Sequence, residues 1–210
     1  MFKNLKSKLI VLDGPDGCGK SSQRDLLAQF LTEHKVKFSC FRDPGSTVTG
    51  EKIRDILLHS DNHISDRAEL LLYMASRAQL WDECIAPAIK KKHCVLLDRW
   101  VSSTCAYQGF AGGVGIQKVI DIAEHSLERV WPDLTIILDV DLKTAKQRMN
   151  RSLDRMEQKA AAYHRKVRAG FLKLAEMRRD IVLVDATKDI QTVHKQVIQT
   201  ISSFFKIKSK

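Results

Sequence analysis

An eight-residue stretch near the N-terminus has the composition and spacing of a phosphate-binding loop. Residues 14–21 read Gly-Pro-Asp-Gly-Cys-Gly-Lys-Ser and fit the pattern G-x-x-x-x-G-K-[ST]. The glycines let successive backbone N–H groups point inward at the N-terminus of a helix, which favours anions. The lysine can reach the β- and γ-phosphates, and the serine hydroxyl can contact Mg²⁺. The loop therefore predicts ATP binding by Gly14, Pro15, Asp16, Gly17, Cys18, Gly19, Lys20, Ser21 and Ser22.

A charged pair, Asp98-Arg99, closes a short apolar run that is typical of a buried strand. A carboxylate at the carboxyl end of a strand beside the phosphate loop can hold Mg²⁺ directly or through water. The neighbouring guanidinium suits phosphate oxygens. We therefore predict Ser21 and Asp98 as the metal site, and Lys20 and Arg99 as catalytic cations. A salt bridge at the end of the strand is the structural alternative.

Two further groups of residues could recognise a base and a sugar. Tyr73 and Arg77 are four positions apart, so one helix face would present a stacking ring and a guanidinium that can donate to a base carbonyl. Alone, that spacing more often marks a core aromatic beside a surface arginine. A second segment offers hydroxyl and amide groups that can distinguish a base edge or sense a sugar 2′ position: Ser102, Ser103, Thr104, Tyr107 and Gln108. Helix caps would explain its serines alone.

Short apolar segments alternate with helical patterns along the chain. The predicted strands are residues 8–13, 36–41, 94–97, 134–138 and 181–184. The predicted helices are residues 20–34, 49–58, 66–91 with a kink near Pro87, 101–108, 116–127, 143–149, 158–178 and 190–204. This order predicts an α/β fold of the P-loop NTPase type, a five-stranded parallel sheet with helices on both faces. No repeat or linker divides the chain, so residues 1–210 are predicted to form a single domain.

Composition narrows the class of protein. Hydrophobic residues at 44% and charged residues at 29% are ordinary for a globular protein. The first apolar run, residues 9–12, is too short to span a membrane, and we expect a cytoplasmic protein. Five scattered cysteines without a C-x-x-C pair indicate neither zinc nor a disulfide framework. Cys18 alone could be a reactive thiol, because it lies in the glycine loop.

The net charge of +10 suggests anionic partners. Residues 146–179 hold 11 Lys/Arg against 3 Asp/Glu. This stretch is either a solvated basic helix face or a lid that faces phosphates. No helix-turn-helix, zinc-finger or RNP pattern accompanies the charge, so no nucleic-acid partner is expected.

Six segments, in order, resemble the thymidylate kinase family, and the likeness extends over residues 9–185. They are residues 13–23 (DGPDGCGKSSQ), 42–47 (RDPGST), 73–79 (YMASRAQ), 98–109 (DRWVSSTCAYQG), 132–135 (PDLT) and 154–157 (DRME). The resemblance implies an enzyme that transfers the γ-phosphate of ATP to dTMP with Mg²⁺, giving ADP and dTDP for dTTP synthesis. It also implies a homodimer.

The resemblance further implies a substrate site for dTMP. Tyr73 and Arg77 would hold the thymine base, and Thr104 would lie near it. The remaining implied substrate residues are Asp16 near the sugar 3′-hydroxyl and the metal, Arg42 near the dTMP phosphate, Arg99 at phosphate groups, Tyr107 against the deoxyribose, and Gln108. Asp43 stands where the family usually has glutamate, so its role is open and could be limited to stabilising the turn.

Phosphoryl transfer needs positive charge over the migrating group. This phosphate loop contains no arginine, so the charge is expected from a short helical lid at about residues 146–158. Arg148, Arg151 and Arg155 are candidates, and we predict Arg151 and Arg155 as the catalytic pair. The resemblance is thus to the type that carries its catalytic arginine in the lid.

Two other activities are compatible with the phosphate loop. The nearer is a P-loop kinase for another nucleotide or for a deoxynucleoside. The more distant is a P-loop ATPase stimulated by nucleic acid, suggested by the net charge. A GTPase would need a guanine-reading Asn-Lys-x-Asp motif, which the sequence lacks.

Overall fold

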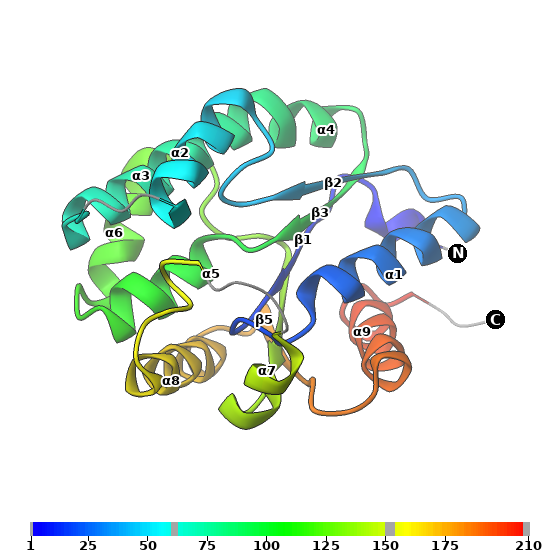
Figure 1. Ribbon diagram of the computed structural model, residues 1–210. Coiled ribbons are helices and arrows are strands. Elements are labelled where there is room, and N and C mark those ends of the chain that lie inside the picture. The colour runs from blue at the N-terminus through cyan, green and yellow to red at the C-terminus, as the bar shows by residue number, and fades with distance from the viewer. Residues whose placement is uncertain (1, 60–62, 150–153, 208–210) are drawn as a thin grey trace.

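The computed structural model describes residues 2–59, 63–149 and 154–207. Within these residues, five parallel strands form one sheet in the order β2-β3-β1-β4-β5 (Figure 1). They are β1 (Leu9–Asp13), β2 (Phe38–Arg42), β3 (Cys94–Asp98), β4 (Leu134–Asp139) and β5 (Ile181–Asp185). The predicted five-stranded parallel sheet is confirmed.

The central strand β1 shows why the sheet is covered on both sides. Leu9 and Val11 belong to one hydrophobic core, whereas Ile10 and Leu12 belong to another. Successive side chains of a strand point to opposite faces, so a continuous apolar run needs two covered faces. All five residues of β1 are buried, including Asp13 at its carboxyl end.

Helices cover both faces of the sheet, as predicted (Figure 1). One core contains residues of α1 (Lys20–Glu33), α7 (Leu142–Arg148) and α9 (Ile190–Phe204). The other contains residues of α3 (Asp66–Leu80), α6 (Ile116–Ser126) and α8 (Ala161–Met177), and α2 (Val48–His59) packs against α3. The short helices are η1 (Lys3–Leu5), α4 (Ala86–Lys90) and α5 (Val101–Thr104). No helix of the described residues is both long and apolar enough to cross a bilayer.

Two π-helical segments depart from the predicted helices: η2 (Trp81–Ile85) and η3 (Cys105–Ala111). The first precedes Pro87, which lies in the first turn of α4. Proline cannot donate to the carbonyl four residues earlier, and its ring crowds that carbonyl, so the preceding turn widens. The second continues a helix that was predicted to stop at Gln108, and its residues Tyr107 and Gln108 line a cavity. π-helical turns are frequent at functional sites.

The predicted lid is described only in part. Helix α7 ends at Arg148, and residues 150–153 lie outside the described part. Residues 155–158 form turns, in which Asp154 Oδ1 accepts from the backbone N–H groups of Met156 and Glu157, both at 2.9 Å. Because these turns occupy residues that were predicted to be helical, helix α8 begins only at Ala161, three residues later than predicted.

Candidate active site

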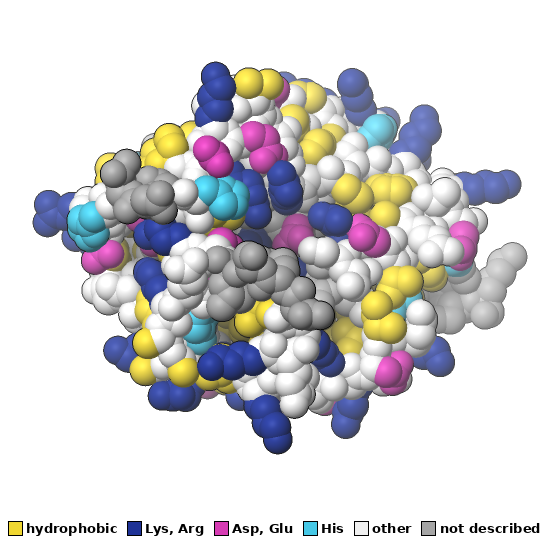
Figure 2. Space-filling model, viewed as in Figure 1, with side chains coloured by type: hydrophobic (Ala, Val, Ile, Leu, Met, Phe, Trp, Pro, Cys, Tyr) yellow, Lys and Arg dark blue, Asp and Glu magenta, His cyan; other side chains and the backbone are white. Residues whose placement is uncertain are grey.

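A cavity of about 850 Å³ lies at the carboxyl edge of the sheet. Figure 2 shows Lys/Arg and Asp/Glu side chains gathered around a hollow near the middle of the face in view. Parallel strands direct functional loops to this edge. The predicted site residues that line the cavity are Asp16, Gly17, Cys18, Gly19, Lys20, Ser21, Ser22, Arg42, Tyr73, Arg77, Asp98, Arg99, Thr104, Tyr107 and Gln108. One cavity thus joins groups that the sequence presented separately.

The phosphate loop packs closely against its neighbours. Gly14 and Gly17 have φ angles of 137° and 76°. A Cβ atom at these positions would lie 2.6 Å from Leu138 O and 2.4 Å from Ala145 O, respectively. Only glycine fits both the conformation and the space. The loop is therefore held between the end of β4 and α7, at the N-terminus of α1, where backbone N–H groups favour phosphate.

Lys20 is buried inside the curve of this loop. Its Nζ donates to Pro15 O at 2.9 Å and to Gly14 O at 3.1 Å. The ammonium is thus fixed beside the position that the loop prepares for phosphates. Cys18 lies against Lys20, is 2% exposed, and has a thiol pKa raised by burial. These features favour an inert, buried thiol over a reactive one.

Arg99 connects the phosphate loop with the segment after β3. Its Nη1 donates to Gly14 O at 3.0 Å and to Ser103 Oγ at 2.9 Å, and its Nη2 pairs with Asp16. Asp16 also accepts from Tyr107 Oη at 2.6 Å. Burial alone would raise the pKa of Asp16, but Arg99 and Lys20 hold it below its usual value. Burial and Asp16 raise the pKa of Tyr107 well above normal, so this phenol remains a donor.

Asp13 is a part of the site that the sequence analysis missed. This buried carboxylate accepts from Ser102 Oγ at 2.5 Å, from Ser103 Oγ at 2.6 Å and from the Gly14 N–H at 2.8 Å. It therefore fixes the start of the phosphate loop against α5. A carboxylate that ends an apolar strand just before a glycine loop is the signal that could have identified it.

Ser21 and Asp98 lie together at one side of the loop. Ser21 Oγ donates to Asp98 Oδ2 at 3.4 Å. A hydroxyl and a carboxylate are oxygen ligands that suit Mg²⁺, which commonly takes one or two protein ligands and completes its shell with phosphate oxygens and water. Among the described residues, no cluster of three His, Cys, Asp or Glu could hold a metal by itself. The pair fits a metal that arrives with a nucleotide.

The predicted base pocket is built around a buried ion pair. Arg77 is 1% exposed; its Nε donates to Asp43 Oδ2 at 2.7 Å, and its Nη2 donates to the same carboxylate and to Thr104 Oγ1 at 3.1 Å. Tyr73 lines the same cavity one turn earlier on α3. Asp43 therefore does more than stabilise a turn, because it neutralises and orients the guanidinium. The pairing partner could not be read from the sequence, where the two are 34 positions apart.

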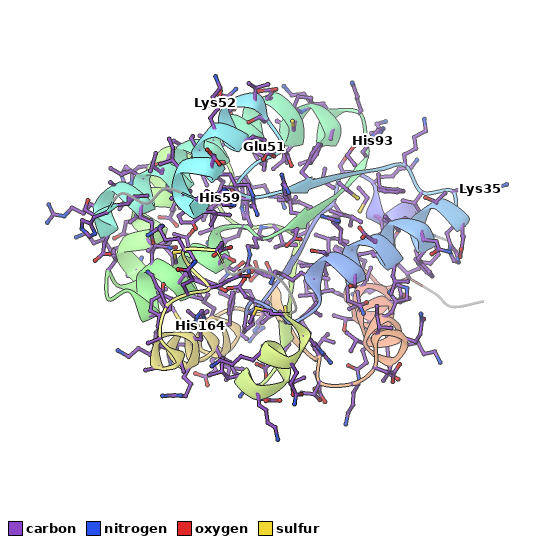
Figure 3. All side chains as sticks on the ribbon, in the orientation of Figure 1. Lys35, Glu51, Lys52, His59, His93 and His164 are labelled. Carbon is purple, nitrogen blue, oxygen red and sulfur yellow. The ribbon has the colours of Figure 1, made fainter. Side chains whose placement is uncertain are left out.

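Two arginines lie beyond the base pocket. Arg42 pairs with Glu51 at 2.8 Å; Glu51 is labelled on α2 in Figure 3. Arg54 also lines the cavity and donates to Pro44 O at 3.0 Å. Burial, and then the nearby Arg42, lower the pKa of Arg54. Arg54 was not among the predicted site residues, and no motif of the sequence identifies it.

The lid arginines have different surroundings. Arg148 lines the cavity and donates from Nη1 to Ala186 O at 2.7 Å. Arg151 lies outside the described residues. Arg155 does not lie among the described residues of the cavity wall. Its Nε donates to Leu57 O at 2.7 Å, and its Nη2 pairs with Glu69.

These contacts describe the surroundings of Arg155, whose catalytic role stays a prediction. A guanidinium that is engaged by a buried carboxylate and by a helix end has its charge compensated there. Glu69 in turn accepts from Gln108 Nε2 at 2.8 Å. Glu69 was not among the predicted site residues, although it stands four positions before Tyr73 on the same helix face.

The chain is similar over nearly its whole length to proteins of one named family. Residues 12–197 match the family model described as thymidylate kinase. The thymidylate kinase of Thermoanaerobacter sp. (strain X514) is 42% identical over 202 residues, which are 95% of this chain and 100% of the relative. The thymidylate kinase of Thermosipho africanus is 40% identical, over 90% of this chain and 94% of the relative. A crystal structure of thymidylate kinase from Ehrlichia chaffeensis superimposes with a TM-score of 0.75 at 28% identity, covering 94% of this chain and 99% of that one.

Proposed function

This chain belongs to the thymidylate kinase family, and on that premise we propose that it transfers the γ-phosphate of ATP to dTMP, giving ADP and dTDP for dTTP synthesis. The observation that carries the proposal is the shared cavity, which is lined by the phosphate loop and by Tyr73 and Arg77. Two nucleotides bound at these places would meet phosphate to phosphate. Holding both reactants in one cavity makes the transfer effectively intramolecular.

We assign the donor nucleotide to the phosphate loop. The loop N–H groups and Lys20 would bind the β- and γ-phosphates. Ser21 and Asp98 would hold Mg²⁺, which supplies charge neutralisation at the phosphate oxygens. Arg148 lies at the same end of the cavity as the β5–α9 connection. It would face the parts of ATP that extend beyond the β- and γ-phosphates.

We assign the acceptor nucleotide to the opposite end of the cavity. Tyr73 would stack on thymine, and Arg77, held by Asp43, would donate to a base carbonyl. The other acceptor contacts would come from Thr104 and Gln108 at the base, Tyr107 and Asp16 at the sugar, and Arg42 and Arg54 at the 5′-phosphate.

The transfer requires positive charge at the transferring group and an in-line arrangement of the two phosphates, but it does not require a strong base. The acceptor phosphate is already anionic, so it can attack the γ-phosphorus in line without losing a proton to the protein. Lys20 and Arg99 would stabilise the charge that spreads over the transferring group. We keep Arg151 as the proposed lid cation.

A coupled assay of ADP release on dTMP, dUMP, dCMP, AMP and thymidine tests this function. We expect the highest kcat/KM for dTMP. Arg77→Ala should lower kcat/KM for dTMP by about 100-fold, the scale at which a site rejects a poorly matched substrate, and leave the KM for ATP unchanged.

Arg77→Ala leaves the buried Asp43 without a counter-charge, which can itself destabilise the fold. The charge-neutral double variant D43N/R77Q is therefore assayed beside it and should show the same selective loss. A wild-type protein that prefers AMP, dCMP or thymidine to dTMP would assign the chain to another nucleotide kinase.

We also propose a homodimer and a cytoplasmic location, both of which rest on the family. Apolar side chains on the outer faces of α2 and α3 support the dimer, since Val48, Ile56 and Leu71 are exposed by 74%, 46% and 57%. Light scattering should give twice the chain mass of 23.9 kDa. A mass of one chain at micromolar concentration would contradict the dimer.

A further inference from the structure

A buried carboxylate that the proposed chemistry does not use lies directly behind the base pocket. Glu69, in the first turn of α3, is 3% exposed and does not line the cavity itself. Its Oε1 accepts from Gln108 Nε2 at 2.8 Å, and its Oε2 accepts from the Arg155 guanidinium. Both oxygens therefore have a donor, and one of these donors belongs to a residue of the cavity wall.

The contact with Glu69 fixes which way the Gln108 amide points. An ionised carboxylate only accepts hydrogen bonds, so it must face the NH₂ group of the amide and not the carbonyl. Gln108 is 4% exposed and lines the cavity. Oε1 is then the atom that Gln108 can offer to a bound base, and it can only accept.

The π-helical backbone around Gln108 is held by its own hydrogen bonds. Gln108 lies in the π-helical segment η3, next to Tyr107, whose hydroxyl donates to Asp16 at 2.6 Å. Gly112 N–H donates to Tyr107 O at 2.8 Å, which closes the wide turn around both residues. The adjacent side chains of Tyr107 and Gln108 thereby both line the cavity, the first beside Asp16 of the phosphate loop and the second beside Glu69.

Arg155 holds Glu69 in place from the opposite direction. Its backbone N–H donates to Leu58 O at 3.2 Å and its Nε donates to Leu57 O at 2.7 Å, so the residue caps the last turn of α2. A cation is favourable at that end of a helix, where carbonyl groups are left without partners. In Figure 1 the segment before α8 rises towards α2 and α3, which is consistent with these bonds.

We propose that Glu69 is a positioning residue for base selection, which sets Gln108 as an acceptor towards the pyrimidine, with Arg155 as its fixed counter-charge. Thymine and uracil carry an N3–H donor at the edge that such an acceptor would meet, whereas N3 of cytosine is itself an acceptor. The arrangement therefore favours dTMP over dCMP. This inference rests on the proposed function and extends it to residues behind the cavity wall.

Glu69→Gln tests the proposal, because it preserves shape while giving Gln108 a partner that can donate as well as accept. The ratio of kcat/KM for dTMP to that for dCMP should fall about 10- to 100-fold, the effect of one unmatched buried hydrogen bond. The KM for ATP should not change. Glu128→Gln is the matched control: Glu128 accepts from Trp81 Nε1 at 3.0 Å outside the cavity, and its replacement should leave the ratio unaltered.

A double-mutant cycle separates positioning from general support of the fold. Gln108→Ala should reduce the same ratio, and E69Q/Q108A should be no worse than Gln108→Ala, because Glu69 acts through Gln108. Losses that multiply in the double variant would overturn the proposal. If Glu69→Gln alone does not fold, the charge-neutral pair E69Q/R155M carries the same comparison. An unchanged dTMP-to-dCMP ratio in Glu69→Gln refutes this inference only, whereas no dTMP turnover in the wild type refutes the proposed function and this inference with it.

Discussion

At the residue scale, the phosphate loop fits its surroundings only because Gly17 has a hydrogen atom in place of a side chain. Gly17 combines a φ of 76° with a would-be Cβ only 2.4 Å from Ala145 O. Gly113 has a similar φ of 80° but no atom within 4 Å of its would-be Cβ. The two glycines thus share the backbone strain of a positive φ and differ in the space available.

Gly17→Ala and Gly113→Ala should therefore lose different amounts of stability. Left-handed strain costs each variant about 1–2 kcal/mol. Gly17→Ala should lose about 1–3 kcal/mol more of its unfolding free energy, because the added methyl group is forced against the α7 backbone. Urea unfolding measures the difference, and ATP titration should show weaker binding in Gly17→Ala alone. Equal losses of stability with unchanged ATP binding would show that the loop does not depend on this close approach.

Most residues of the candidate site could be predicted individually from the sequence, because they belong to short local motifs. Lys20 and Ser21 follow from the loop pattern, and Tyr73 with Arg77 from helical spacing and the family resemblance. Their partners were not predictable. Glu69 meets Arg155 across 86 positions, and Asp13 meets Ser102 across 89, so only the folded chain brings them together.

At the scale of elements, the sequence predicted the strands well and the helices less well. Each strand is a short apolar run between turns, and all five appear within two residues of the predicted starts. The residues of η2 were predicted as part of a helix with a kink near Pro87, and η3 was predicted as helix only as far as Gln108. Apolar spacing indicates which face of a helix is buried, but it does not show whether one turn holds an extra residue. This omission matters for function, since η3 presents Tyr107 and Gln108 to the cavity.

The lid is a second region in which the sequence pattern did not determine the arrangement of the side chains. Basic composition suggested that residues 146–179 could face phosphates. In the structure, Arg168 on α8 forms a two-point pair with Asp139, and Lys173 pairs with Glu176 on the same helix. Among the described cations of this stretch, Arg148 lines the cavity. The α8 part is therefore a solvated basic face, which composition alone could not distinguish from a lid.

At the scale of the whole molecule, the parallel sheet explains why the function is confined to one edge. All five strands point their carboxyl ends the same way, and the 850 Å³ cavity is lined by residues that follow β1, β2, β3 and β5 and by the end of α7. The residues proposed to bind the two nucleotides thus line one cavity, on strand ends and helices. The central claim is that phosphate passes directly between the two nucleotides.

Transfer of a labelled phosphate tests that claim most directly. Protein incubated with Mg²⁺, dTMP and ATP labelled at the γ-phosphorus should place the label in dTDP, one for each ADP formed. Lys20→Ala should reduce this rate by orders of magnitude while circular dichroism shows a retained fold, because Lys20 is the buried cation of the loop. Lys173→Ala, on the solvated face of α8, should transfer label like the wild type. Label found only in inorganic phosphate, or undiminished dTDP formation by Lys20→Ala, would contradict the account.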